Sequence, residues 1–131
     1  AVADWRVASE APEKLKKTSG AAPSLTLTEN PDILATISRS AKRPHVVVGF
    51  AAETGNVTEN ASQKLKKKGC DLIVANDVST GSGVFGGERN TVQLVSAAGV
   101  EDWPQMSKDE VARKLIERLA QMLVPQNKVS E

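Results

Sequence analysis

Two apolar segments on either side of an amphipathic one constrain the fold of this chain more than any other feature. Residues 46–51, Val-Val-Val-Gly-Phe-Ala, form a continuous apolar run, which is typical of a strand covered on both faces. Across residues 57–68 an apolar residue recurs every four positions, and Gly69 follows where a left-handed helix cap is common. Residues 70–75 form a second buried strand pattern. Together they predict a βαβ unit with parallel strands and a right-handed crossover.

The segments before this unit predict mostly short elements. Residues 1–3 have the pattern of the end of a buried strand without an initiator Met, so we expect a domain that lacks its first part. Residues 6–24 lack any apolar period and predict a loop, and residues 25–28 alternate as a half-buried strand does. Asn30 and Pro31 predict the start of a helix with three apolar residues facing inward. These three are Ile33, Leu34 and Ile37.

After the unit, residues 76–90 form a polar, glycine-rich excursion and residues 91–95 a further strand. Ser107 and Glu110 match a capping box at the start of a closing helix with one apolar stripe, made by Val111, Leu115, Leu119 and Met122. The fold class predicted is therefore α/β: a three-layer, Rossmann-like, mostly parallel sheet with helices on both faces, lacking its N-terminal strands in this chain.

Composition excludes several classes of function. The 131 residues fit one domain, and their net charge of +1 lacks the strong basic field of a general nucleic-acid binder. No apolar run reaches the roughly 18 to 20 residues that cross a bilayer, so we expect a soluble protein with no membrane partner. The single cysteine, Cys70, fits a reducing compartment, and we expect the cytoplasm.

Polar residues cluster where the predicted strands end. Ligands of open α/β sheets bind beyond the carboxyl ends of the strands, where loops and helix N-termini converge. Asp4 and Trp5 follow the first predicted strand, Glu53 and Thr54 the second, and residues 76–77 the third. This convergence predicts a site for a nucleoside triphosphate.

Lysines could supply the charge for such a site. Lys64 and Lys68 lie four positions apart on one predicted helix, so their ammonium groups repel unless an anion lies between them. A solvated basic face is the simpler interpretation of this run, and it applies equally to Lys14, Lys16 and Lys17. Their closeness to the strand-end turns favours a phosphate role, because compact cationic groups suit a triphosphate.

Other conspicuous residues have structural interpretations. Phe50 is more often a core residue than a stacking platform, Cys70 is a small buried strand residue, and His45 belongs to a loop. Residues 81–86 fit the G-x-G-x-x-G pattern but do not run from a strand directly into a helix, so we interpret them as a flap rather than a dinucleotide fingerprint. No cluster has metal-ligand spacing, so we expect no protein-held metal, and a divalent ion carried by phosphates.

Five signatures occur in the order that resembles the synthetase half of the bifunctional bacterial phosphopantothenoylcysteine synthetase/decarboxylase. They are A-V-A-D-W-R, P-E-K-L-K-K, N-P-D-I-L, V-G-F-A-A-E-T and Q-K-L-K-K-K-G-C-D-L-I-V-A-N-D-V. The resemblance implies that residues 1–124 are the C-terminal part of that synthetase domain and residues 125–131 a tail. It also implies a parent chain with a fused flavin-dependent decarboxylase, no flavin in this part, and a homodimer whose subunits complete each other's sites.

The resemblance implies a ligase of coenzyme A synthesis. In the family, CTP with Mg²⁺ activates 4′-phosphopantothenate as an acyl-cytidylate, and L-cysteine then displaces CMP. By position, Asp4 would contact the cytidine with backbone groups of Ala3 and Trp5, and Lys14 would bind the triphosphate and serve amide formation. The other implied nucleotide contacts are Pro31, Asp32, Ile33, Leu34, Phe50, Lys64 and Lys68.

This chain departs from the family pattern at its beginning, where a phosphate turn and residues that handle the acyl-cytidylate are expected. We therefore expect it to be inactive alone. Two other classes stay open: a noncatalytic nucleotide- or polyanion-binding module, which would bind weakly and without preference for cytidine, and a nicotinamide-dependent oxidoreductase that uses the glycine-rich flap.

Overall fold

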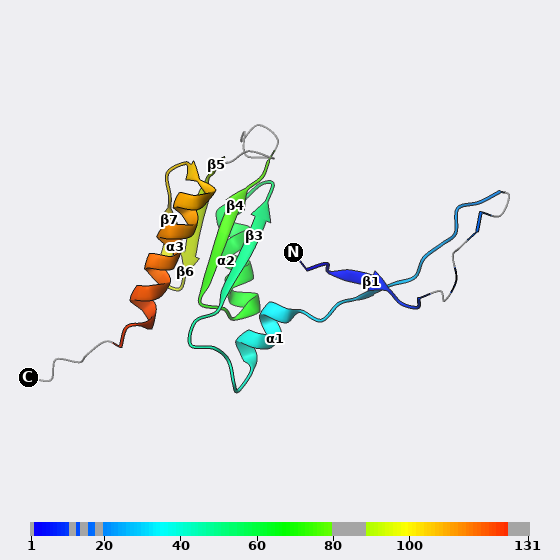
Figure 1. Cartoon of the computed structure of the whole chain (residues 1–131), viewed down its shortest axis with the longest axis horizontal. Coiled ribbons are helices and arrows are strands. Elements are labelled where there is room, and N and C mark those ends of the chain that lie inside the picture. Colours follow the sequence, from blue (N-terminus) through cyan, green and yellow to red (C-terminus); the bar gives the residue numbers. More distant parts are fainter. Residues whose placement is uncertain (1, 11–12, 14–15, 18–19, 80–88, 126–131) are drawn as a thin grey trace, which may run out of the picture. The chain divides into compact units, whose positions relative to one another are not determined.

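The computed structural model describes residues 2–10, 13, 16–17, 20–79 and 89–125, and these divide into two units, residues 1–33 and 34–131 (Figure 1). Each unit is described by itself. The glycine-rich flap expected at residues 81–86 and most of the tail expected at residues 125–131 lie outside the described residues.

The first unit is a two-stranded antiparallel ribbon. Strand β1 (Trp5–Val7) pairs with β2 (Leu27–Glu29), with Trp5 opposite Glu29. All three side chains of β1 are exposed, and only the middle residue of β2 is half-buried. The sequence prediction was wrong here in three respects: residues 2–3 are exposed rather than part of a buried strand, the loop expected from residue 6 overlaps β1, and Leu25 and Leu27 are exposed.

Helix α1 (Ile33–Arg39) begins two residues later than predicted. Asn30 does not cap it, because the Asn30 side chain donates to the carbonyl of Ala3 at 2.7 Å and accepts from Arg6 at 3.1 Å. Ile33 and Ile37 are exposed, so their predicted inward orientation was wrong. Leu34 alone of the three predicted residues packs against a core, and the fully buried α1 residues are Ala35 and Ser38.

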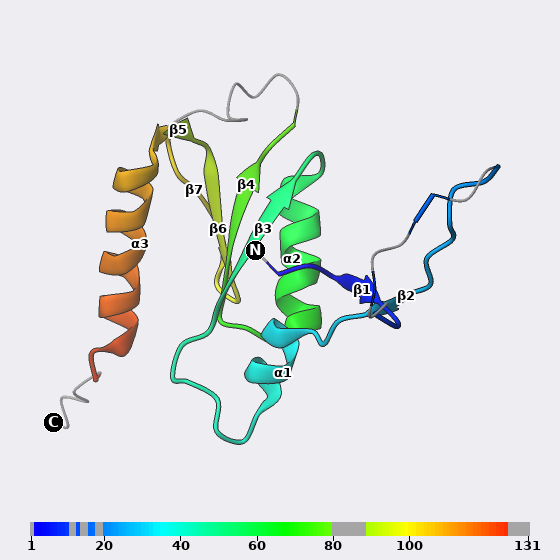
Figure 2. The ribbon, with the colours of Figure 1, turned by 45° about the vertical axis from the view of Figure 1, so that its right-hand side comes forward.

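A four-stranded mixed sheet forms the centre of the second unit, in the order β3-β4-β6-β7 (Figure 2). Strands β3 (Val48–Glu53) and β4 (Leu72–Asp77) are parallel and joined by α2 (Val57–Lys68), which confirms the βαβ unit. Strands β6 (Val92–Ser96) and β7 (Gly99–Asp102) continue the sheet with antiparallel pairings. The α/β class is confirmed, but only one of these three pairings is parallel.

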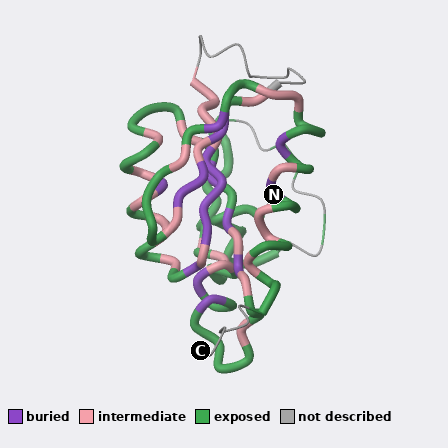
Figure 3. The backbone as a smooth tube through the Cα atoms, turned by 90° about the vertical axis from the view of Figure 1, so that its left-hand side faces the viewer, coloured by how far each residue is buried: buried purple, intermediate pink, exposed green. Residues whose placement is uncertain are grey.

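Two helical layers cover this sheet. Alternate residues of β4 point to opposite faces, so Ile73 and Ala75 join the cluster under α2, whereas Leu72 and Val74 join the cluster under α3 (Lys108–Leu123). Figure 3 shows the buried residues gathered along the central strands. The stripe predicted on the closing helix is confirmed, because all four of its apolar residues pack into the α3 cluster. Helices therefore lie on both faces of the sheet.

Capping explains where α2 ends and where α3 begins. Gly69 has φ 75° and its N–H donates to the carbonyl of Leu65, so α2 ends in a left-handed glycine. The Ser107 hydroxyl accepts from the N–H of Glu110 while the Glu110 carboxylate accepts from the N–H of Ser107, so the predicted capping box is formed. Next to this cap, the short strands β5 (Arg89–Asn90) and β8 (Met106–Ser107) pair with each other.

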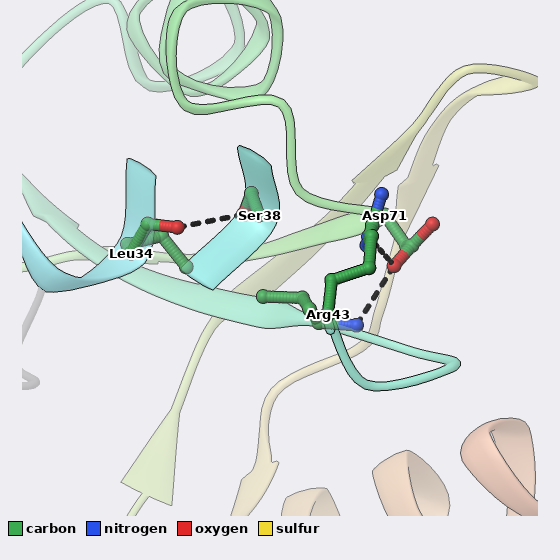
Figure 4. A network of polar contacts seen from close by, with 5 residues as sticks. Leu34, Ser38, Arg43 and Asp71 are labelled. Carbon is green, nitrogen blue, oxygen red and sulfur yellow. Dashed lines mark hydrogen bonds and ion pairs between the residues drawn. The ribbon is translucent and has the colours of Figure 1, made fainter. Parts of the chain in front are cut away.

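Polar contacts fasten the amino ends of β3 and β4. One carboxylate oxygen of Asp71 accepts from the Arg43 guanidinium at 2.5 Å and from the N–H of Val47 at 2.7 Å, and in α1 the Ser38 hydroxyl donates to the carbonyl of Leu34 (Figure 4). A charge-assisted contact of this kind holds the loop before β3 against the start of β4. The carboxyl ends of these strands lie at the opposite edge of the sheet, away from the Arg43–Asp71 contact, and form the candidate site.

Candidate functional site

The carboxyl ends of β3 and β4 lie side by side. Ala52 pairs with Asn76 and Glu53 pairs with Asp77, so the polar residues that the sequence placed at the ends of these two strands are adjacent. The predicted convergence is confirmed for these two strands, because parallel strands joined by a helix end at the same edge of a sheet. Alternation along the strands puts Glu53 and Asp77 on the α2 face, and Phe50 and Asn76 on the α3 face.

On the α2 face, Glu53 forms an ion pair with Lys64. The Glu53 Oε1 and Lys64 Nζ atoms are 2.6 Å apart, although their angles fall outside those of a hydrogen bond. The second oxygen of Glu53 accepts from the amide of Asn60 at 3.3 Å, and the same amide donates to the carbonyl of Gly55 at 2.9 Å. The first two turns of α2 therefore hold the last residue of β3.

Asp77 occupies the neighbouring position on the same face. Its carboxylate accepts from the hydroxyl of Ser79 at 2.6 Å and from the N–H of Ser79 at 2.9 Å. The hydroxyl first, and then the backbone N–H, lower the pKa of Asp77 below its ordinary value. Asp77 therefore stays ionised at neutral pH and fixes the backbone that leaves β4.

On the α3 face, Phe50 is 68% exposed because β3 is the edge strand of this sheet as described. The sequence predicted a strand covered on both faces, with Phe50 more often in the core, and that interpretation was wrong for Phe50. On the neighbouring strand, the side-chain oxygen of Asn76 is buried with no hydrogen-bond partner among the described residues. On this face the exposed ring of Phe50 is open to a ligand, and the Asn76 oxygen is an unsatisfied acceptor beneath the surface.

The two lysines predicted on α2 lie one turn apart, and both are half-buried. Their placement on one helix is confirmed. Sequence reasoning expected the ammonium of Lys64 to need an anion, and the structure provides one from within the chain, the Glu53 carboxylate. Glu53 was recognised as a strand-end residue but not as the partner of Lys64, and the signal for it is a carboxylate ending a strand that feeds a lysine-bearing helix.

The remaining candidates belong mostly to the ribbon unit. Asp4 precedes β1 and Trp5 lies within it, whereas the sequence placed both after a strand. The carbonyls of Ala3 and Asp4 accept from the side chain and the N–H of Asn30, at 2.7 and 2.8 Å, so these residues are joined to the residue that follows β2. Lys14 lies outside the described residues.

The predicted nucleotide-lining run 31–34 divides into exposed and packed residues. Pro31 and Asp32 are exposed residues before α1, and Ile33 is its exposed first residue. Leu34 packs against the α2 cluster and is the near neighbour of Gly49, where an added Cβ would lie 2.5 Å from a Leu34 methyl group. The Leu34 side chain, which is half-buried, therefore serves the core.

Two negative findings apply to the described residues only. In those ranges no three His, Cys, Asp or Glu side chains gather as metal ligands. Within the same part of the chain, no helix has the length and apolar character needed to cross a membrane.

Comparisons with known proteins show which family the chain belongs to. A family model described as "DNA/pantothenate metabolism flavoprotein C-terminal domain" matches residues 1–123. The protein named "Coenzyme A biosynthesis bifunctional protein CoaBC" of Haemophilus influenzae is 42% identical over 119 residues, and that of Escherichia coli strain K12 is 40% identical over 121 residues. These matches cover 91% of this chain but only 29% and 30% of the two relatives.

Solved structures extend the comparison to three dimensions. The crystal structure of the C-terminal domain of Coenzyme A biosynthesis bifunctional protein CoaBC matches with a TM-score of 0.62 and 35% identity, covering 76% of this chain and 45% of that one. The DNA/pantothenate metabolism flavoprotein from Streptococcus pneumoniae matches with a TM-score of 0.58 and 22% identity, covering 76% of this chain and 43% of that one, and this likeness concerns the fold alone.

Proposed function

This chain belongs to the DNA/pantothenate metabolism flavoprotein C-terminal domain family, and we propose that it is part of a CTP-dependent phosphopantothenate–cysteine ligase of coenzyme A biosynthesis. The chain spans about three-tenths of the length of the curated relatives it matches, so the proposal concerns the full-length protein that carries it. The proposed partners are CTP, 4′-phosphopantothenate and L-cysteine, with a homodimer as the working assembly and a fused decarboxylase in the same protein.

The proposed reaction has two steps. The carboxylate of phosphopantothenate attacks the α-phosphorus of CTP, and the bond to pyrophosphate breaks, giving an acyl-cytidylate. The amine of cysteine then attacks the acyl carbon, and CMP leaves with the bonding electrons as the amide forms and the amine loses its proton. Neither step needs a covalent enzyme intermediate, so catalysis depends on positioning and on stabilising the developing charge.

The chain's own residues would bind and orient the nucleotide. Lys14, Lys64 and Lys68 would neutralise the triphosphate, Phe50 would pack beside the nucleotide, and Asp4 would accept from the cytidine. Ala3 and Trp5 would contribute backbone groups to base recognition, and residues 31–34 would line the nucleotide. No described group fits a protein-held metal, so Mg²⁺ would arrive bound to the phosphates, where it neutralises charge.

One observation carries the proposal: an ion-paired lysine and two strand-end carboxylates, those of Glu53 and Asp77, lie together at the carboxyl edge of a parallel strand pair. This edge is where open α/β sheets bind ligands. The choice of CTP over other anions comes from the resemblance in the five sequence signatures. A noncatalytic polyanion-binding module remains the second candidate, because the charges alone do not select a base.

The test is calorimetric titration of the full-length protein with CTP in the presence of Mg²⁺, beside ATP and GTP. The proposal predicts heat of binding for CTP and weaker binding of the other two nucleotides. Equal, salt-sensitive binding of all three would instead support the polyanion-binding module. Lys14→Gln should strongly reduce amide formation, and an unchanged rate in this variant would contradict the assignment of Lys14.

A further inference from the structure

The Glu53 carboxylate is held from two directions by α2. Lys64 approaches one oxygen at 2.6 Å, and Asn60, one turn earlier in the same helix, donates to the other at 3.3 Å. The Glu53 side chain is only 12% exposed, whereas that of Lys64 is 45% exposed. The carboxylate is therefore sheltered and fixed, and the lysine side chain that it holds is nearly half exposed.

A fixed carboxylate lowers the entropy cost of ordering the lysine side chain when a ligand binds. A lysine side chain loses about 2 kcal/mol of rotamer entropy when it is ordered, and a ligand that must order it bears that cost. Glu53 orders it before any ligand arrives. The ammonium group of Lys64 has three N–H bonds, so its contact with Glu53 leaves donors available for a ligand. That contact is an ion pair whose angles fall outside those of a hydrogen bond.

The charges around this pair balance. Glu53 and Lys64 cancel, and Lys68, one turn further along α2, adds a positive charge. Asp77, which lies on the same face, stays ionised and offsets that charge, while its carboxylate accepts from both donors of Ser79. An anion would therefore be bound by direct contact with the ammonium groups rather than by a net positive field. A comparable arrangement exists in protein kinases, where a lysine paired with a glutamate contacts ATP phosphates and must be paired to act.

We infer that Glu53 is a positioning residue, which holds the ammonium group of Lys64 toward the phosphate chain of the nucleotide. The inference rests on the proposed function, since it assigns a phosphate contact to Lys64. Glu53 itself touches neither the substrate nor the reacting atoms, so its removal should affect nucleotide binding through Lys64 and leave the other substrates unaffected.

The first experiment measures steady-state kinetics of Glu53→Gln in the full-length protein that carries this chain. The amide keeps the size of the side chain and removes its charge. We expect the KM for CTP to rise about 10-fold, with kcat and the KM for cysteine changed less than about 2-fold. Glu59→Gln is the matched control, because Glu59 lies on α2 and contacts only the Gln63 amide among the described contacts, and it should behave as wild type.

A second measurement separates positioning from general destabilisation. Glu53→Gln should weaken binding of CTP and of pyrophosphate but not of cytidine, because only the first two carry the phosphates that Lys64 would contact. Glu53→Asp, which retains the charge on a shorter side chain, should restore part of the lost affinity. Equal weakening of cytidine and CTP, or a glutamine variant as good as wild type, would overturn the inference.

A double-mutant cycle with Lys64→Gln distinguishes the inference from the proposed function. Lys64→Gln should weaken CTP binding more than Glu53→Gln, and adding Glu53→Gln to it should cause little further loss. If Lys64→Gln weakens binding but the two effects add fully, the positioning role is overturned and the ligase proposal stands. If Lys64→Gln has no effect on CTP binding, both the positioning role and the phosphate role of Lys64 are overturned.

Discussion

The two units of this chain differ in what holds their candidate site residues in place. The ribbon of residues 1–33 has strands whose side chains are almost all exposed, so its order depends on backbone pairing and on the contacts of Asn30. In the unit of residues 34–131, two buried clusters lie on opposite faces of a sheet. Lys64 and Phe50 therefore belong to a unit with a buried core, whereas Asp4 and Trp5 belong to an exposed ribbon.

This difference teaches that the two units of one chain can differ widely in local stability. A two-stranded ribbon is marginally stable by itself, and further packing is needed to fix its conformation. We therefore expect nucleotide or another subunit to order the ribbon, and the sheet unit to be preformed. The predictions below test this contrast.

The largest expected effect comes from removing core volume in the sheet unit. Ile73 is 1% exposed in β4, and Ile73→Ala should lower the free energy of unfolding by about 2–5 kcal/mol through lost burial and the cavity left behind. Leu27, in β2, is 53% exposed, and Leu27→Ala should change the same quantity by less than about 0.5 kcal/mol. Urea denaturation followed by circular dichroism measures both, and equal losses would contradict the contrast between the units.

A smaller effect is expected from two glycines with positive φ. Gly69 ends α2 at φ 75°, and Gly69→Ala should cost about 1 kcal/mol of unfolding free energy because a Cβ strains this conformation. Gly20, at φ 125°, lies in the ribbon unit, in which no described residue is buried. Gly20→Ala should leave the urea midpoint unchanged, and a shift as large as that of Gly69→Ala would show that the ribbon unfolds together with the sheet.

The smallest expected effect is a pH dependence of the free energy of unfolding, caused by Glu101 in the outer strand β7. The Arg118 guanidinium, at 2.7 Å, is the main cause that lowers the pKa of Glu101, and the Trp103 indole N–H, at 3.0 Å, adds to it. Because the folded pKa lies below the unfolded one, the stabilisation is complete above the ordinary glutamate pKa and is lost as the pH falls through the folded value.

Carbon-detected NMR titration of the Glu101 carboxyl group measures this shift. In Arg118→Gln the pKa of Glu101 should return toward its ordinary value, and the acid-dependent part of the stability should shrink. Lys108→Gln is a suitable control, since it removes a positive charge from the same helix at its first residue. A Glu101 pKa that stays equally low in Arg118→Gln would contradict the assigned cause.

Local sequence signals predicted those elements whose boundaries are set by local chemistry. The βαβ unit, the Gly69 cap and the Ser107 capping box follow from periodicity and from residues that satisfy helix ends, and all were found. Strand β7 was missed because Gly99–Asp102 contains one large apolar residue, and the antiparallel pairing of β6 depends on contacts distant in sequence. The ribbon was predicted poorly because its apolar residues are exposed, so their pattern did not report burial.

The candidate site likewise has one feature that the sequence predicted and one that it did not. The convergence of residues 53 and 77 was predictable, because parallel strands joined by a helix end at one edge. The pairing of Glu53 with Lys64 was not, because it depends on how α2 is rotated over the sheet and on which rotamer the lysine adopts. The resemblance to a known family supplied the nucleotide, which no local pattern could identify.

Amide hydrogen exchange of the full-length protein, with and without CTP and Mg²⁺, tests the central claim most directly. The account predicts slow exchange in β4 in both states, and new protection on CTP addition at residues 53–54, at residues 64–68 and in the ribbon around residues 3–6 and 30–33. Protection that appears in neither unit at saturating CTP, or that appears equally with any polyanion, would contradict the account.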